Sequence, residues 1–172
     1  NPAAQRWYQR CGEITLEALA ASNFYNRAHE HYLDRGAFGI AATETVAGRH
    51  GKGLHFRSFP VGSYSVAHNG RDEVDTLARC YRLTPAQIID IFPEENVPAE
   101  VHKKQADDKA RTAPLEVVQI IRPRQDRNPK KSDGKNKPFE SLHILKEEKH
   151  ILAESGFDEF PIAVSRWELW GD

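Results

Sequence analysis

The chain has 172 residues, and its 24 lysines and arginines against 25 aspartates and glutamates leave a formal net charge of −1. This near balance argues against a protein whose whole surface binds nucleic acid, although it permits a local basic patch. Hydrophobic residues at 39% and charged residues at 28% are typical of a soluble domain, and the length suits a single one. No apolar run approaches the roughly 20 residues of a membrane-spanning helix, so we expect no membrane contact.

The ends of the sequence and its cysteines indicate its context. The sequence begins at Asn1, contains no methionine and stops at Asp172 directly after a strand-like run. We therefore expect a piece of a longer protein. Cys11 and Cys80 lack the CxxC spacing of a redox or zinc motif, so we expect isolated, buried thiols in a reducing compartment.

Residues 1–36 predict one long amphipathic helix, from Pro2 to about Arg35. Apolar and small side chains recur at alternating spacings of four and three, which places them on one face of a helix: Trp7, Cys11, Ile14, Ala18, Ala21, Tyr25, Ala28 and Tyr32. We favour packing of this face on the protein's own domain. The alternative is a subunit-contact helix that uses Trp7, Cys11, Ile14, Tyr25 and Tyr32. Ser22 and Asn23 are poor helix formers and predict a kink or a second N-cap in the middle.

Residues 37–92 predict a β-meander followed by a capped helix. Strands are expected at 38–46, from Leu54, from Tyr64 and at 74–83, with a tight turn at Asn69-Gly70, where both residues tolerate positive φ. The glycine-rich loop at 47–53 lacks the strand-loop-helix context of a phosphate-binding loop, so we expect a hairpin connection. Thr84-Pro85-Ala86-Gln87 is a capping box. The helix after it offers four apolar side chains for burial: Ile88, Ile89, Ile91 and Phe92.

Residues 93–172 predict a short helix and the later strands. The helix is expected at 99–109, an interior strand at 115–124, a hairpin at 139–146 and 150–153, and a last strand at 162–170. The fold class is therefore α+β in a single domain at 1–172. Its long helix is expected to pack on a mostly antiparallel, partly barrel-like sheet with short helices.

The segment 122–137 is the one local concentration of positive charge. A solvated, mobile loop is one interpretation, and contact with phosphate groups is the other. The second would define a small nucleic-acid-binding domain. No aromatic residue interleaves, so base stacking is unsupported. The candidate phosphate-contacting residues are Arg122, Arg124, Arg127, Lys130, Lys131, Lys135 and Lys137.

No arrangement of residues predicts catalysis or metal binding. His29 and His31 are two apart and point to different sides of a helix. His50, His55 and His68 have no cysteine or carboxylate partners at ligand spacing, and no HExxH motif occurs. We expect no catalytic residues, no metal, no cofactor and no enzyme. An enzyme with an unmarked site would need titrating residues that converge in a pocket.

Several segments, in this order, resemble the bacteriophage head-to-tail connecting (portal) protein family of short-tailed phages. They are SNFY at 22–25, GAFGIAA at 36–42, GRDEVDTLARCYRLTPAQI at 70–88, VVQIIRPR at 117–124 and LAESGFDEFPIAVSRWELWGD at 152–172. Glycines, aromatic residues and β-branched residues dominate these segments. The similarity therefore concerns the fold rather than a reaction.

The resemblance implies a structural part of a portal, the head-tail connector of a phage or prophage. Such proteins form a homo-oligomeric ring at one capsid vertex of the virion, after assembly in the host cytoplasm. DNA passes through the ring during packaging and ejection, and the full-length protein meets the capsid, the packaging motor and the tail or adaptor proteins. The segment is similar to the outer wing region, which contacts neighbouring subunits or the capsid. A ring requires head-to-tail interfaces that close.

Overall fold

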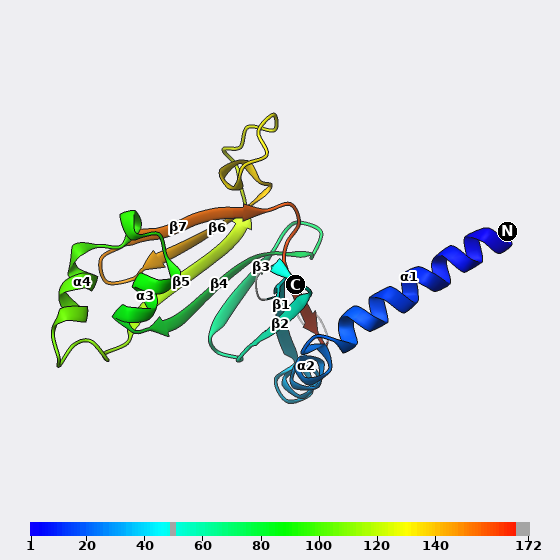
Figure 1. Ribbon diagram of the computed structural model, residues 1–172, viewed down its shortest axis with the longest axis horizontal. Coiled ribbons are helices and arrows are strands. Elements are labelled where there is room, and N and C mark those ends of the chain that lie inside the picture. Colours follow the sequence, from blue (N-terminus) through cyan, green and yellow to red (C-terminus); the bar gives the residue numbers. More distant parts are fainter. Residues whose placement is uncertain (49–50, 168–172) are drawn as a thin grey trace. The chain divides into compact units, whose positions relative to one another are not determined.

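The computed structural model describes residues 1–48 and 51–167 and groups the chain into two compact units (Figure 1). The first unit comprises residues 1–61 and the segment from Pro161 onward, and the second comprises residues 62–160. Whether the two units form a single domain stays a prediction. The predicted α+β fold, with a long N-terminal helix, antiparallel sheets and short helices, is confirmed.

The first unit begins with two helices, and the break between them lies at Ser22-Asn23, where the sequence predicted a kink or a second N-cap in one long helix. Helix α1 covers Pro2–Ala20 and helix α2 covers Phe24–Phe38. Asn23 is the residue before α2 but makes no capping hydrogen bond. Its side-chain amide instead donates to the carbonyl of Phe56 and accepts from the N–H of Phe56, both at 2.8 Å. The helix breaks because Asn23 pairs with a strand that lies 33 residues away in the sequence.

A three-stranded antiparallel sheet completes the first unit. Strand β1 (Ile40–Ala47) lies between β2 (Leu54–Phe59) and β8 (Ile162–Arg166). Helix α2 packs along β1 and β2, with the rings of Phe24 and Phe56 5.1 Å apart. Since β2 is an edge strand, the bonds from Asn23 satisfy backbone groups that the sheet leaves unpaired. The last strand was predicted to continue to Trp170, but residues 168–170 lie outside the described part of the chain.

The second unit contains a five-stranded antiparallel sheet with the order β3-β4-β5-β6-β7. The strands are Tyr64–His68, Val74–Leu83, Leu115–Pro123, Phe139–Leu145 and His150–Phe157. The β5 strand is central, as its nearly continuous apolar sequence predicted. The two sheets of the chain are open, so the predicted partly barrel-like closure is wrong. Closure would require β3 and β7 to pair, whereas β7 lies beside the short helix η3 (Gly134–Asn136).

The core of the second unit lies on one face of this sheet, beneath helices α3 (Pro85–Ile91) and α4 (Ala99–Ala106). Along β5 every second residue from Leu115 to Ile121 is buried, which is the alternation of a sheet covered on one face. Ile91 was predicted to be buried but is 57% exposed, because α3 turns that position away from the sheet. The buried cluster comprises Ile88, Phe92, Val97, Val101, Leu115, Val117, Leu145 and Leu152.

The predicted turn at Asn69-Gly70 forms, but its geometry differs. The positive φ of 59° belongs to Asp72, and neither Asn69 nor Gly70 has a positive φ. The Asn69 side-chain oxygen accepts hydrogen bonds from the backbone N–H groups of Arg71 and Glu73. A side chain that mimics a backbone turn therefore replaces the expected two-residue turn.

The predicted capping box is present at the start of α3. The Thr84 hydroxyl accepts a hydrogen bond from the Gln87 N–H at 3.4 Å, and the Gln87 side chain accepts one from the Thr84 N–H at 2.9 Å. We expect Thr84→Ala to lower the free energy of unfolding by about 1 kcal/mol, because it exposes an unpaired N–H of the first turn. Urea unfolding monitored by circular dichroism measures this. Thr84→Ser, which keeps the hydroxyl, is the control, and an equal loss in both variants would contradict the capping role.

Candidate interaction surfaces

Arg124, one of the predicted phosphate-contacting residues, lies in an ion-pair network instead of facing solvent. Its side chain is only 7% exposed, and its Nη1 atom lies 2.6 Å from Glu154 Oε1 and 3.6 Å from Glu140 Oε2. Its Nη2 atom donates to the carbonyl of Ser155 at 3.0 Å. The guanidinium therefore joins the end of β5 to β6 and β7. This contact holds the pKa of Glu154 below its usual value of 4.5.

Three further basic residues of the segment also meet carboxylates. Arg122 pairs with Glu140, its cross-strand partner in the register of β5 and β6. Lys137 Nζ lies 2.7 Å from Asp158, and Lys135 Nζ lies 3.7 Å from Glu154, which already binds Arg124. The same arginines and Lys135 line a hollow of about 560 Å³ together with three acids, Asp126, Glu140 and Glu154. Because the three cations of this hollow are matched by three anions, it carries no excess positive charge for a phosphate group.

The remaining basic residues of the segment are Arg127, Lys130 and Lys131, which make no ion pair among the described residues. They belong to a loop with its own internal hydrogen bonds. Asp133 accepts from the Lys135 N–H, and the Asn136 side chain accepts from the Asn128 N–H. Phosphate contact by the segment stays a prediction, now limited chiefly to three side chains.

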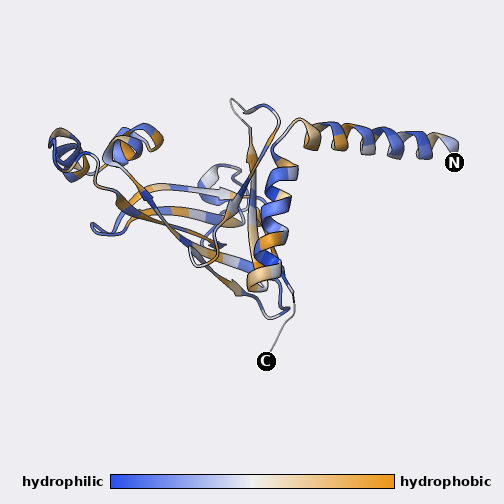
Figure 2. Ribbon diagram, turned by 90° about the horizontal axis from the view of Figure 1, so that it is seen from below, coloured by the Kyte–Doolittle hydropathy of each residue, from blue (hydrophilic) through white to orange (hydrophobic). Residues whose placement is uncertain are grey.

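The apolar face of the two N-terminal helices is exposed. Trp7 is 62% exposed, Ile14 51%, Tyr25 58% and Tyr32 68%, and Figure 2 shows hydrophobic and hydrophilic residues alternating along α1. Helix α1 has no buried residue, so the close packing that the sequence favoured for this helix is not found within the described residues of the first unit. A contiguous apolar surface that is exposed to water indicates an interaction surface. The role of these residues in subunit contact stays a prediction.

A small apolar groove lies between α2 and the three-stranded sheet, with a volume of about 200 Å³. His31 lies on its wall, with Nδ1 2.8 Å from Thr43 Oγ1 and Nε2 2.6 Å from Ser165 Oγ. A neutral imidazole has one donor and one acceptor nitrogen, so one hydroxyl accepts and the other donates. His31 thereby connects α2 to β1 and β8. Burial, followed by the charge of Arg35, lowers the pKa of His31 below 6.5, while Asp34 acts in the opposite direction.

The lowered pKa of His31 predicts a pH-dependent stability. A histidine whose pKa is depressed in the folded state stabilises fully above its unfolded pKa of 6.5, and this stabilisation is lost as the pH falls through the folded pKa. We expect the free energy of unfolding to fall as the pH drops below about 6.5, and His31→Gln to have a shallower slope. Urea unfolding at several pH values measures this, and parallel curves for the two proteins would contradict it.

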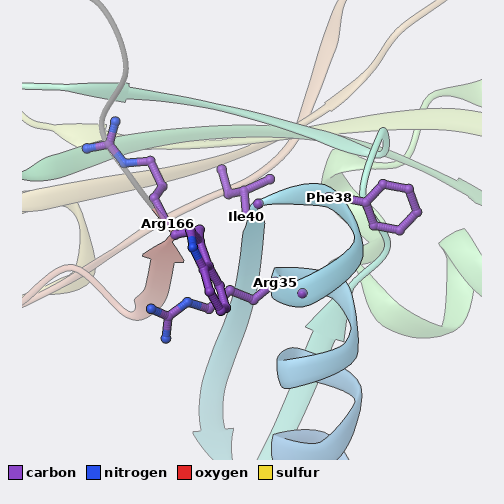
Figure 3. A pocket seen from close by; sticks show the side chains of 7 residues that line it. Arg35, Phe38, Ile40 and Arg166 are labelled. Carbon is purple, nitrogen blue, oxygen red and sulfur yellow. The ribbon is translucent and has the colours of Figure 1, made fainter.

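A more open hollow of about 500 Å³ lies at the C-terminal end of α2 (Figure 3). Arg35 and Arg166 contribute two guanidinium groups, and Arg35 lies 5.5 Å from the centroid of the Trp167 ring, a cation–π contact. Figure 3 shows Phe38 on the other side of the helix end from Arg166 and Ile40. The chain continues from Trp167 into residues outside the described part, so we assign no ligand to this hollow.

Polar side chains also gather on the core face of the five-stranded sheet, which the sequence analysis did not predict. Arg79 Nε donates to Gln119 at 2.6 Å, and Gln119 donates to Ser141 at 3.3 Å. Beside them, the Tyr81 hydroxyl lies 2.8 Å from His143 Nδ1. Gln119 and Ser141 are buried. These contacts satisfy buried polar groups and link three strands, which gives the group a structural role.

The burial of the two cysteines differs from the prediction. Both cysteines are free, but Cys80 is exposed and Cys11 is half-buried, so the expectation of buried thiols is wrong. In residues 1–48 and 51–167 no three histidine, cysteine or acidic side chains lie close enough to hold a metal ion. His50 lies outside those residues.

None of the described helices is both long and apolar enough to cross a membrane.

These observations define an α+β protein with exposed apolar residues on its N-terminal helices, and comparison with known proteins identifies its family. The family model for the bacteriophage head to tail connecting protein matches residues 2–172. The chain belongs to this family, which confirms the resemblance drawn from the sequence.

Two curated relatives cover nearly the whole chain. The portal protein of Salmonella phage epsilon15 is 34% identical over 168 residues, which are 96% of this chain and 30% of the relative. The probable portal protein of Bordetella phage BPP-1 is 30% identical over 173 residues, which are 99% of this chain and 31% of the relative. The chain therefore spans less than a third of the length of these relatives.

Proposed function

We propose that this chain is a structural segment of a phage portal, the ring that connects head and tail. The family membership and the two relatives named as portal proteins carry this proposal. In it the segment belongs to the outer wing region and contacts neighbouring subunits or the capsid protein. The full-length protein meets the packaging motor and the tail, and DNA passes through the ring. The segment itself has no enzymatic role.

The exposed face of α1 and α2 supports a role in subunit or capsid contact. Trp7, Ile14, Tyr25 and Tyr32 are all more than half exposed, and large aromatic side chains are enriched in protein interfaces. The ion pairs of Arg124 also support a structural role for the segment. Because its charges neutralise one another, this end of the five-stranded sheet is better suited to a rigid frame than to DNA contact.

The proposal places the protein at one vertex of the virion, and immunogold labelling tests this. Antibodies against residues 1–172 should label particles at one vertex, next to the tail, when particles are purified from cells that carry the gene. Particles that have lost their tails are the control, because the vertex should then become more accessible. Labelling over the whole capsid surface, or of unassembled protein only, would contradict the proposal.

The competing proposal is a small nucleic-acid-binding domain that uses segment 122–137, and the salt dependence of binding separates the two. If only Arg127, Lys130 and Lys131 can contact phosphates, the slope of log K against log salt should be no steeper than about −3. All seven basic residues would give a slope near roughly −6. We expect weak binding to duplex DNA with the shallow slope. Fluorescence anisotropy with the chain and with Lys130→Gln/Lys131→Gln measures this, and the steep slope would favour the competing function.

A further inference from the structure

The face of the five-stranded sheet opposite the core has no fully buried residue on β4 to β7. We call it the open face. Cross-strand partners share a face, and the register pairs Ala78 with Ile120, Cys80 with Val118, and Val118 with Ile144. Ile151 is 48% exposed, and the other apolar residues of the face, apart from Cys80, are half-buried. The apolar residues of the open face are Ala78, Cys80, Val118, Ile120, Leu142, Ile144 and Ile151.

Ion pairs border this apolar area at both ends of the strands. At one end Glu116 pairs with Arg82 at 3.2 Å and with Lys146 at 2.6 Å, and at the other end Arg122 pairs with Glu140. Glu116 and Arg122 are six residues apart on β5, which corresponds to roughly 20 Å. An α-helix with its side chains is about 10 Å wide, so a helix fits between the two charged borders.

A shallow hollow of about 240 Å³ lies on the open face near β3. Small side chains border it, among them Ser65, Ala78 and Cys80. Such a hollow can receive a bulky side chain from another element. Apolar area with a hollow, between satisfied charges, is the usual composition of an interface centre and its rim.

Helix α1 offers the matching surface. Trp7, Cys11, Ile14 and Ala18 form a stripe on one side of a helix that has no buried residue. Most of the stability of a protein helix comes from the packing of its apolar face, and no residue of α1 is buried. Helix on sheet is the ordinary way in which two such faces cover each other. Within the described residues, the same chain therefore carries a helix without a buried residue and a sheet face without a fully buried residue on β4 to β7.

We infer that α1 of one subunit packs on the open face of the neighbouring subunit, with the Trp7 to Ala18 stripe against the Val118 and Ile120 area. The inference rests on the proposed function, because it names one of the subunit contacts of the ring. The two surfaces are different, so the contact runs head to tail and can repeat around a closed ring, whereas a contact between identical surfaces stops at a dimer. The footprint of α1 is on the order of 300 Å². A specific interface covers roughly 800 Å² on each side, so further surfaces contribute.

The two natural cysteines of the segment provide the test, because Cys11 lies on the α1 stripe and Cys80 on the open face. The full-length protein is used, with any cysteine outside residues 1–172 replaced by serine, and a short bis-maleimide links thiols in the assembled sample. We expect a ladder of linked dimers, trimers and larger species on a denaturing gel. Cys11→Ser and Cys80→Ser should each abolish the ladder, and a mixture of the two variants should give linked dimers only.

A second measurement does not depend on thiol distance. Ile14→Glu places a charge on the stripe, and Leu16→Glu places the same charge about 200° away around the helix. Both side chains are exposed, at 51% and 59%, so neither change disturbs a core. We expect Ile14→Glu to raise the protein concentration needed for ring assembly by about tenfold and Leu16→Glu to leave it unchanged.

Electron micrographs of the same samples separate the failure of this inference from that of the proposed function. Rings with a ladder that needs both cysteines, and with an effect of Ile14→Glu alone, support the inference. If rings form, three results would overturn the inference and leave the portal role standing. These are the absence of any link between subunits, a link in a variant that keeps only one of the two cysteines, and an equal effect of Ile14→Glu and Leu16→Glu on assembly. The absence of rings from the unaltered full-length protein overturns both.

Discussion

Replacing Arg124 by methionine is expected to lower the free energy of unfolding by about 2 kcal/mol. Methionine keeps much of the side-chain length but leaves Glu154 and Glu140 without their shared partner. The expected loss is smaller than for a fully buried pair, since Glu154 is still 27% exposed and retains some water. Urea unfolding measures the effect. Lys130→Met, at an exposed position without an ion pair, is the control and should change stability by less than about 0.5 kcal/mol.

The pH dependence of this effect identifies its cause. The Arg124 hydrogen bond lowers the pKa of Glu154 in the folded state below 4.5. The resulting stabilisation is present above the unfolded pKa of about 4.5, and it is lost as the pH falls through the lower folded pKa. The difference between wild type and Arg124→Met should therefore shrink in acid. Adding Glu154→Gln to the Arg124 variant should restore part of the lost stability, and an unchanged difference at all pH values would contradict the network.

Replacing Leu145 by alanine is expected to lower the free energy of unfolding by about 3 kcal/mol. Leu145 is fully buried and belongs to the core cluster beneath α3 and α4. The change removes apolar contacts and leaves a cavity that the sheet cannot collapse to fill, since β6 is bound by strands on both sides. Ile91→Ala is the control, because Ile91 is 57% exposed. It should cost less than about 1 kcal/mol, and a similar loss in both variants would contradict the assigned core.

The local signals in the sequence predicted most of the strands and helix starts. The order Thr84-Pro85-Ala86-Gln87 predicted a cap that the structure contains. These features depend on neighbours within a few residues, so the sequence pattern alone determines them. The central place of β5 followed from its β-branched residues for the same reason.

The features that the sequence did not predict depend on distant partners. The sequence predicted a break at Ser22-Asn23, but it did not predict that Asn23 pairs with Phe56, 33 residues further on. Nor did it predict that Arg124 is neutralised by Glu154, 30 residues further on. Neither pairing can be known before the strand register is known. The partly barrel-like closure was wrong for a similar reason, because the alternation of a strand reports one buried face and not which edge strands meet.

The exposed surfaces were the hardest to predict. The stripe of α1 has the spacing of a core helix, and the sequence favoured that interpretation. An apolar stripe indicates that one face of a helix is buried, but it does not show whether the same chain or another molecule buries it. The structure leaves Trp7 and Ile14 uncovered, so the choice shifts toward a partner outside this chain.

The most direct test of the proposed function is the solution mass of the full-length protein, followed by electron micrographs, with residues 1–172 measured alongside. The portal proposal predicts closed rings from the full-length protein. A monomeric segment beside those rings would place further assembly determinants outside residues 1–172. A full-length protein that stays monomeric and binds DNA with a steep salt dependence would contradict the proposal, and segment 122–137 would then become its functional site.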